Sequence, residues 1–344
     1  MSSRIGGKRK AAATVARLTG ATSLLRGWRQ RSPQALTILA YHRVLDIGDE
    51  DAFEFDVELV SASVAGFERQ MRHVREHYVP LTFRDVLDRV ENRVPLPRGA
   101  CVVTFDDGYS DNYENAFPIL RRLGIPATMF VSTGYLDSGE TFWFDRVAHA
   151  VLRTRQPALA LGGLPALDLA RGTRARRSEL VRLLRHLMRV PDRERVRLAQ
   201  LAIATLLPDA PLRHAASAPM TWDHVSEMSR AGIEFGAHTV SHPVLSMLEP
   251  ERLRGELRDS KQRIEQVLGQ RVEVIAYPVG GRDAFSPEVQ SAVRDAGYRL
   301  GVSYVPGTER PPQWDPFALR RIHVERYVDA AWFEAMLAAP RFFA

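Results

Sequence analysis

Two adjacent carboxylates follow an apolar run in the stretch ACVVTFDDGY, so Asp106 and Asp107 stand at the end of a predicted buried strand. An ionised side chain is costly to bury, and two neighbours of like charge are costlier still. The turn preference of Asp-Gly accounts for one acid here, but less well for two acids after an all-apolar run. A divalent cation would offset the repulsion between them. The pair therefore favours a metal site over a simple turn.

A second stretch, GAHTVSH, carries His238 and His242, four residues apart and directly after another predicted strand. If this segment turns helically, both imidazoles face the same way and can share one cation. A lone histidine is more often structural, and an H-x3-H pair alone is weak evidence. With the paired carboxylates, however, two imidazoles and one carboxylate form the ligand set of a catalytic metal site that stays open to water and substrate. The second carboxylate then remains available to take a proton from water.

These groups need a scaffold that brings distant strand ends together. Short apolar, β-branched runs alternate with segments of helical periodicity, which is typical of a parallel sheet with right-handed crossovers. The predicted strands cover residues 36–41, 101–105, 126–131, 232–237, 272–277, 298–304 and 318–324, and the predicted helices cover 66–78, 83–91, 112–123, 222–230, 250–268 and 286–296. Seven strands suggest a closed barrel, in which the residues that follow the strands gather at one rim.

The segments outside this alternation divide the chain. Residues 36–330 form the predicted barrel domain, and residues 140–220 are expected to be a helical insertion between two of its strands. Residues 331–344 are expected to form a C-terminal helix or tail. Residues 1–35 hold eight Lys/Arg and no acid, which fits either a solvated tail or a basic amphipathic helix on an anionic membrane.

Composition narrows the class of protein further. Of the 344 residues, 45% are hydrophobic and 26% charged, as in a soluble globular protein. The net charge of +6 is concentrated in residues 1–35 and 151–200, and the rest of the chain is net acidic, which argues against a nucleic-acid binder. A single cysteine, Cys101, excludes an intrachain disulfide. No apolar stretch is long enough to span a bilayer and no clear signal peptide is present, so we expect a cytoplasmic protein, with the inner face of the membrane as a further site.

The motifs resemble those of a known family. TFDDGYSDNY and HTVSH are similar to the T-F-D-D-G and H-[ST]-x-x-H signatures of the polysaccharide deacetylases of carbohydrate esterase family 4. YHRVL, LRRLGIPATMFVSTGYL and TWDHVSEMSRAGIEFGAHTVSH resemble its bacterial exopolysaccharide-type branch, so the likeness covers about residues 36–325. The resemblance implies a distorted (β/α)7 barrel and metal-dependent removal of acetyl groups from N-acetylated, sometimes O-acetylated, sugars.

The resemblance also implies roles for single residues. Asp106 would be the general base, and the metal ligands would be Asp107, His238 and His242, holding zinc or, alternatively, cobalt or nickel. Thr239 would help to orient the histidine loop. In the branch that begins with a Tyr-His strand the general acid is supplied near the N-terminus, which points to His42, with His323 as its rival.

The third motif departs from the family pattern. The usual Arg-Pro-Pro-Tyr-Gly is replaced by AYPVG at residues 276–280, so the arginine that supports the catalytic carboxylate is absent. The backbone N–H of Val279 is our candidate donor to the oxyanion. We assign substrate binding to three residues near the motifs, and four arginines are candidates to replace the missing one. These are Tyr109, Tyr277 and Pro278, and Arg43, Arg282, Arg320 and Arg321.

The sequence therefore predicts a metal-dependent hydrolase that removes N-acetyl groups from a glycan, whether polysaccharide, oligosaccharide or lipid-linked precursor. An O-acetyl esterase or another amidase on the same metal site is the first alternative. Adjacent carboxylates do not suit the separated pair of a glycosidase. The non-enzymatic alternative is a membrane-surface scaffold of polysaccharide assembly, which the basic tail and the missing arginine support.

Overall fold

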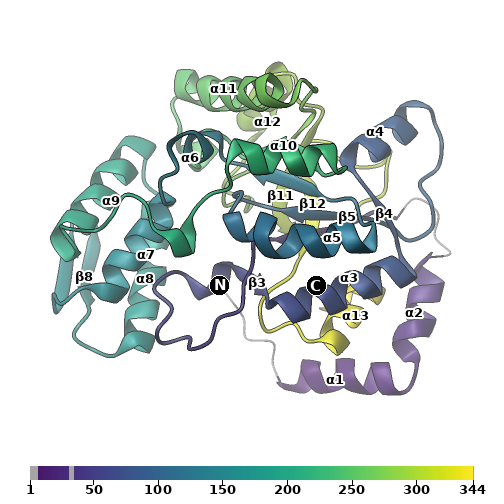
Figure 1. Cartoon of the computed structure of the whole chain (residues 1–344), viewed down its shortest axis with the longest axis horizontal. Helices are drawn as coiled ribbons and strands as arrows, with labels where there is room; N and C mark the ends of the chain where they lie inside the picture. The colour runs from purple at the N-terminus through teal and green to yellow at the C-terminus, as the bar shows by residue number, and fades with distance from the viewer. Residues whose placement is uncertain (1–6, 31–34, 344) are drawn as a thin grey trace.

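A closed barrel of seven parallel strands lies at the centre of the computed structural model, which describes residues 7–30 and 35–343 (Figure 1). Its strands are β1 (Thr37–Tyr41), β5 (Ala100–Phe105), β6 (Thr128–Val131), β9 (Glu234–Ala237), β10 (Val274–Ala276), β11 (Leu300–Pro306) and β12 (Leu319–His323). They pair in the order β1-β12-β11-β10-β9-β6-β5, and pairing of β5 with β1 closes the ring. The predicted barrel and all seven predicted strands are thus confirmed.

Besides the hairpin of the insertion, three short strands were not predicted from the sequence. Residues 104–105 of β5 pair with β6, whereas residues 100–102 pair with β4 (Val79–Leu81), so one strand has three partners. Outside the barrel, β2 (Arg43–Val44) pairs with β3 (Val60–Ala62). Strands of two or three residues are too short to show a period of two, and this is why the sequence pattern does not reveal them.

Helices surround the barrel as α3 (Val64–His77), α4 (Phe83–Glu91), α5 (Phe117–Leu123), α6 (Thr133–Ser138), α10 (Trp222–Arg230), α11 (Pro250–Leu268) and α12 (Pro287–Asp295). Two helix starts follow from the sequence. Thr82 caps α4 in a reciprocal capping box with Asp85, and the side chain of Ser286 accepts the N–H of Val289 at the start of α12. The predicted helix 112–123 begins as a π-helix (Asn112–Ala116) before it continues as α5.

One end of the barrel is closed by α4. Its Phe83 packs into the apolar cluster that fills the barrel interior with Val102 and Phe130. Glu234, at the start of β9, accepts the backbone N–H groups of Phe83 and Arg84 at the first turn of α4, at 2.8 and 3.0 Å. The N-terminal ends of the strands are therefore covered, and the C-terminal ends form the opposite rim.

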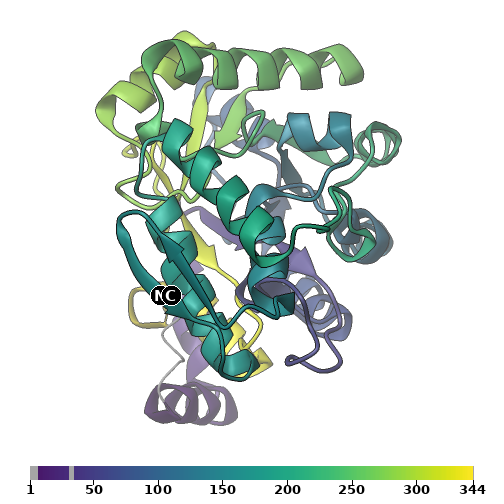
Figure 2. The same cartoon turned by 90° about the vertical axis from the view of Figure 1, so that its left-hand side faces the viewer.

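The insertion between β6 and β9 has an apolar core of its own. It consists of α7 (Trp143–Arg153), a hairpin of β7 (Ala158–Leu161) and β8 (Leu164–Asp168), α8 (Thr173–Leu187) and α9 (Asp192–Leu206), and it faces the viewer in Figure 2. From the sequence we expected a helical insertion and did not predict this antiparallel hairpin, whose residues 162–163 are both glycine.

The first and last helices of the described chain lie together. Helices α1 (Gly7–Leu18) and α2 (Ala21–Gln30) pack against α13 (Ala330–Ala338), which is followed by α14 (Pro340–Phe343). Among the described residues, no helix combines the length and the apolar character needed to cross a membrane.

Candidate active site

The paired acids follow β5 in a tight turn. The N–H of Gly108 donates to the carbonyl of Asp106 at 2.9 Å, and Asp107 has a positive φ of 72°. Gly108 also has a positive φ, and a Cβ there would lie 3.0 Å from Val131. The Asp-Gly pair therefore makes a turn, and that turn directs both buried carboxylates to the rim.

The structure brings the three predicted metal ligands together. Asp107 Oδ1 lies 3.4 Å from His238 Nε2 and 3.1 Å from His242 Nε2, and all three side chains are buried. Their candidate ligand atoms lie within 4.8 Å of one another. Burial raises the pKa of Asp107, but hydrogen bonds from the two imidazoles outweigh this and hold its pKa well below the ordinary value. The carboxylate is therefore ionised, as a metal ligand must be.

The hydrogen bonds of these residues suit a cation. His238 Nδ1 lies 2.8 Å from the carbonyl oxygen of Ala276, so this nitrogen carries a proton, and a bound cation would replace the proton that Nε2 directs at Asp107. Asp107 Oδ2 and His242 Nδ1 are buried without a hydrogen-bond partner among the described residues. Buried polar atoms without partners are costly, and a cation between the three side chains would compensate for part of this cost.

The loop that carries the histidines is not helical, which corrects our sequence expectation. Thr239 and His242 have positive φ angles of 67° and 54°, and Thr239 Oγ1 accepts the N–H of His242 at 3.0 Å. Glu256 of α11 accepts the N–H groups of Val240 and Ser241 at 2.7 and 2.9 Å. We did not select Glu256 from the sequence, where its only signal is an acid on the buried face of a predicted helix.

Two other segments support the metal ligands from outside. Ser132, after β6, donates its hydroxyl to the carbonyl of His238 and its N–H to the carbonyl of Asp107, at 2.9 and 3.2 Å. At the start of the insertion, Trp143 Nε1 donates to the carbonyl of His242 at 3.1 Å. The ring of Phe144 lies 5.0 Å from the imidazole of His242. The insertion therefore forms part of the site.

Arg321 is the arginine that contacts the predicted base. Its Nη1 and Nη2 donate to the two oxygens of Asp106 at 2.7 Å each, and its Nε donates to the carbonyl of Ser303. Burial favours a raised pKa for Asp106, but the guanidinium reverses the effect and leaves the pKa below the ordinary value. The other candidates are placed elsewhere: Arg43 pairs with Asp111, Arg320 pairs with Glu309, and Arg282 is exposed.

The two candidate acids differ in their surroundings. His42 Nε2 lies 4.0 Å from Asp106 Oδ2, and 17% of the His42 side chain is exposed. His323 is stacked on Tyr304 with the ring centroids 3.5 Å apart, and its Nε2 has no partner among the described residues. Burial, followed by the charge of Arg321, lowers the pKa of His323 to about 3. His323 is therefore neutral near pH 7.

The third motif forms a sharp turn after β10. Val279 has a positive φ of 64°, and no acceptor within residues 7–30 and 35–343 is paired with its N–H. Gly280 is required here, because a Cβ would lie 2.6 Å from the backbone nitrogen of Tyr304. Pro278 is buried beside this turn.

The tyrosines that we assigned to substrate binding point into the interior. The hydroxyl of Tyr277 donates to the carbonyl of Phe317 at 2.8 Å, and that of Tyr109 donates to Asp145 Oδ2 at 2.7 Å. Both residues are at most 1% exposed. Their burial lends no support to contact between these rings and a substrate, and the assignment stays a prediction.

A second group of possible ligands joins the insertion to the loop after β2. His149 Nδ1 and His214 Nε2 lie 3.3 and 3.7 Å from Glu54 Oε2. His214 Nδ1, however, accepts the N–H of Ala216, so its proton is on Nε2 and faces the carboxylate. Arg153 pairs with the other oxygen of Glu54. This pattern fits an ion-pair cluster better than a metal site.

Comparison with known families agrees with this geometry. The family described as "Polysaccharide deacetylase" matches residues 93–301, which is more than half of the chain. The chain therefore belongs to the polysaccharide deacetylase family. Members of this family are hydrolases that act on carbon–nitrogen bonds, and the predicted family and enzyme class are confirmed.

Individual relatives are distant. YxkH of Bacillus subtilis (strain 168) is 24% identical over 274 residues, which cover 79% of this chain and 68% of YxkH. The poly-beta-1,6-N-acetyl-D-glucosamine N-deacetylase of Staphylococcus aureus (strain MSSA476) is 29% identical over 122 residues, 33% of this chain and 42% of that enzyme. Among solved structures, the deacetylase PplD of Streptococcus pyogenes has a TM-score of 0.60 at 20% identity and covers 91% of this chain and 100% of its own. IcaB of Ammonifex degensii has a TM-score of 0.55 at 20% identity, with 89% and 96% covered.

Proposed function

We propose that this protein is a metal-dependent deacetylase that hydrolyses N-acetyl groups of a glycan containing N-acetylhexosamine. The observation that carries the proposal is the position of Asp106, which Arg321 holds next to the ligand group of Asp107, His238 and His242. The name of the S. aureus relative identifies a poly-N-acetylglucosamine as its substrate, which supports an acetylated glycan as the partner here.

Asp107, His238 and His242 would hold the cation, and a mixed nitrogen and oxygen ligand set suits zinc, with cobalt or nickel as alternatives. When bound, a divalent cation supplies Lewis-acid polarisation of the acetyl carbonyl and acidifies water. Asp106 is the base that takes a proton from the attacking water. Arg321 keeps this carboxylate ionised and fixes its orientation, so the base is available at neutral pH.

The leaving amine requires an acid, because an amine anion is a very poor leaving group. His42 is suited to this role, since it lies near Asp106 and remains partly exposed at the rim. His323 is stacked on Tyr304 and is neutral near pH 7, so it lacks the acidic imidazolium proton that a general acid needs. The N–H of Val279, which no protein group occupies among the described residues, is the proposed donor to the tetrahedral oxyanion.

The alternative scaffold function loses one of its two supports. That support was the absence of the arginine from the third motif. Arg321, on another strand, supplies a buried guanidinium to the catalytic carboxylate, Asp106. The basic segment 1–35 remains, but a membrane contact there is compatible with an enzyme.

The proposal is tested by acetate release from N-acetylglucosamine oligomers and from an O-acetylated sugar. We expect the chelated protein to be inactive, and zinc reconstitution to restore release from the N-acetylated oligomers. Release from the O-acetylated sugar alone would instead identify an esterase. Equal release before and after chelation, with metal removal verified, would contradict metal dependence.

A further inference from the structure

The helical hairpin formed by α1 and α2 presents apolar side chains to solvent at its turn. Leu18 ends α1 and is 82% exposed, and Leu24 in the first turns of α2 is 77% exposed. Val15 and Leu25 are exposed beside them. We call these four residues the hairpin tip. They lie within eleven residues of sequence around the turn at Gly20, at the lower right corner of Figure 1.

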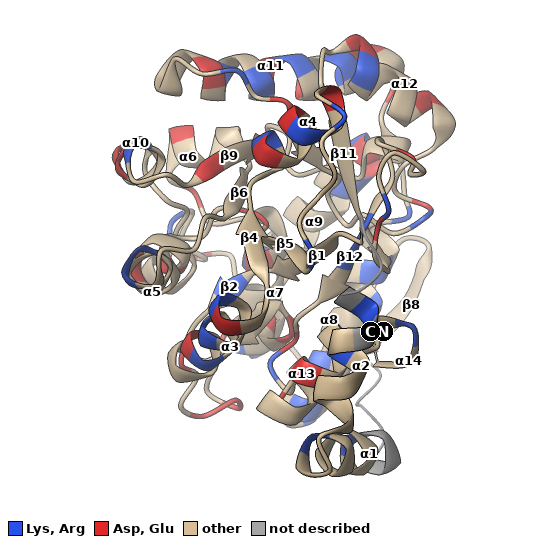
Figure 3. Ribbon diagram, turned by 90° about the vertical axis from the view of Figure 1, so that its right-hand side faces the viewer, with Lys and Arg blue, Asp and Glu red and all other residues tan. Residues whose placement is uncertain are grey.

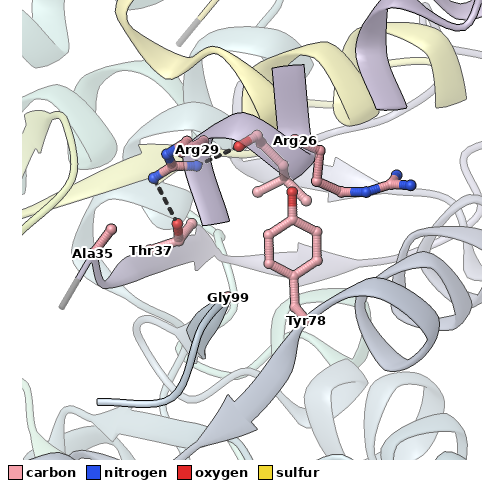
Figure 4. Close-up of a pocket in the computed structure, with 7 residues that line it drawn as sticks. Arg26, Arg29, Ala35, Thr37, Tyr78 and Gly99 are labelled. Carbon is pink, nitrogen blue, oxygen red and sulfur yellow. Dashed lines mark hydrogen bonds between the residues drawn. The ribbon is translucent and has the colours of Figure 1, made fainter. Parts of the chain in front are cut away.

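The opposite face of the hairpin is fixed to the body. Ala13 and Thr22 are buried, and Arg17 pairs with Glu334 of α13 at 3.2 Å. Arg29 donates to the carbonyl of Leu337 and, at 3.0 Å, to the hydroxyl of Thr37 (Figure 4). These contacts attach the hairpin to the body through a face other than the one that carries the exposed leucines. The exposure of the leucines is therefore not caused by detachment of the hairpin from the body.

The charge on the hairpin itself has one sign, and the acid that it contacts, Glu334 of α13, is paired with Arg17. Residues 1–35 contain eight Lys/Arg and no Asp or Glu, and the ribbon of α1 and α2 has no red segment in Figure 3. The side chain of Arg26 extends away from Tyr78 in Figure 4. An apolar tip that projects from a basic segment complements a surface of anionic headgroups above acyl chains. A protein partner would have to fit its surface around this projecting corner instead of entering a groove.

The hairpin lies at the end of the barrel that does not carry the site. Arg29 contacts Thr37, the first residue of β1, and α2 adjoins Gly99, which precedes β5. Asp106 and His42 follow the opposite ends of these two strands. Contact of the tip with a surface therefore leaves the catalytic rim uncovered.

We propose that the hairpin tip inserts into the headgroup region of an anionic lipid bilayer and attaches the protein to it with the catalytic rim open. This proposal is independent of the reaction that the site performs, so it stands or falls separately from the proposed function.

The test is co-sedimentation of the full chain with vesicles of phosphatidylcholine, with and without about 30% phosphatidylglycerol. We expect binding to the anionic vesicles and weaker binding at high salt. The double variant Leu18→Ser with Leu24→Ser should bind at least about tenfold less, because it loses most of the apolar area of the tip. A double variant of two exposed leucines of the insertion, Leu201→Ser with Leu212→Ser, is the matched control and should bind like the wild type.

Three results of the sedimentation experiment would overturn the proposal: no preference of the wild type for anionic vesicles, unchanged binding of the tip variant, or an equal loss in the control variant. The same variants are compared by size-exclusion chromatography. A wild-type dimer that the tip variant abolishes would identify the tip as a contact between two copies, which also contradicts the proposal. Thermal unfolding of each variant verifies that the fold is intact.

Discussion

Arg321 donates to both oxygens of Asp106 across the intervening strand β1, because β12 and β5 are the two neighbours of β1 in the barrel. The third motif of the family would supply an arginine from the end of β10, where this chain has AYPVG. The guanidinium thus reaches the carboxylate from a different strand. A bidentate pair fixes the plane of the carboxylate as well as its charge, which a lysine cannot do.

Arg321→Lys is expected to lower kcat by about 10²-fold, since the base keeps a positive neighbour but loses its fixed orientation. The acid limb of the pH–rate profile should move to higher pH, because a weaker partner allows the pKa of Asp106 to rise. Bound metal should be unchanged. Arg320→Lys is the control, since Arg320 pairs with Glu309 instead. A wild-type kcat and pH profile for Arg321→Lys would refute the role.

His42→Ala should keep its metal and lose about 10²–10⁴-fold in turnover, the usual contribution of a general acid. His323→Phe should retain most of its activity, because a phenyl ring can replace the imidazole in the stack on Tyr304. Steady-state acetate release and metal content would be measured for both variants. The assignment is reversed if His323→Phe is the inactive protein.

Glu256→Gln should weaken metal binding by about 10–100-fold, as expected for a residue that orients the ligand loop. The N–H groups of Val240 and Ser241 both donate to one oxygen of Glu256, Oε2, which the amide oxygen can replace. The amide loses the negative charge, however, and its NH2 group replaces Oε1, which accepts the hydroxyl of Ser241 and pairs with Arg252. The matched control is Glu251→Gln, an exposed acid on the same helix. Competition with a chelator gives the affinity, and equal affinities for the two variants would exclude a role in positioning.

Asp145 should make the stability of the protein depend on pH. Burial raises its pKa from 3.8 to about 6, against the opposing charge of Arg43. The folded protein therefore holds a proton that the unfolded chain has released, and its stability falls as the pH rises from about 4 to 6. Asp145→Asn removes this group, so its free energy of unfolding relative to the wild type should increase by about 3 kcal/mol over that window. Urea unfolding at several pH values measures the difference, and a pH-independent difference would contradict the shift.

Much of the barrel and the metal ligands follows from the sequence, because both depend on local patterns. Most barrel strands are apolar runs, and the acids and histidines directly follow two of these runs. The expected helical turn between His238 and His242 was wrong, because the hydroxyl of Thr239 and the carboxylate of Glu256 stabilise a loop instead. Spacing alone does not report such side-chain contacts with the backbone.

The choice of Arg321 depends on the closed barrel. Asp106 follows β5 and Arg321 lies on β12, and both strands pair with β1 in the closed barrel. This strand order brings the two side chains into contact, and no local segment of the sequence encodes it. The burial of Tyr109 has a similar origin, since its hydroxyl contacts Asp145 in the insertion. Tertiary pairing of this kind cannot be read from composition or periodicity.

The most direct test of the central claim compares wild type and Asp106→Asn, with metal content and acetate release from N-acetylglucosamine oligomers measured on the same zinc-reconstituted samples. The Asn variant keeps the shape of the side chain but cannot take a proton. We predict one metal per chain in both proteins and turnover in the wild type alone. Comparable turnover in the two proteins would contradict Asp106 as the base.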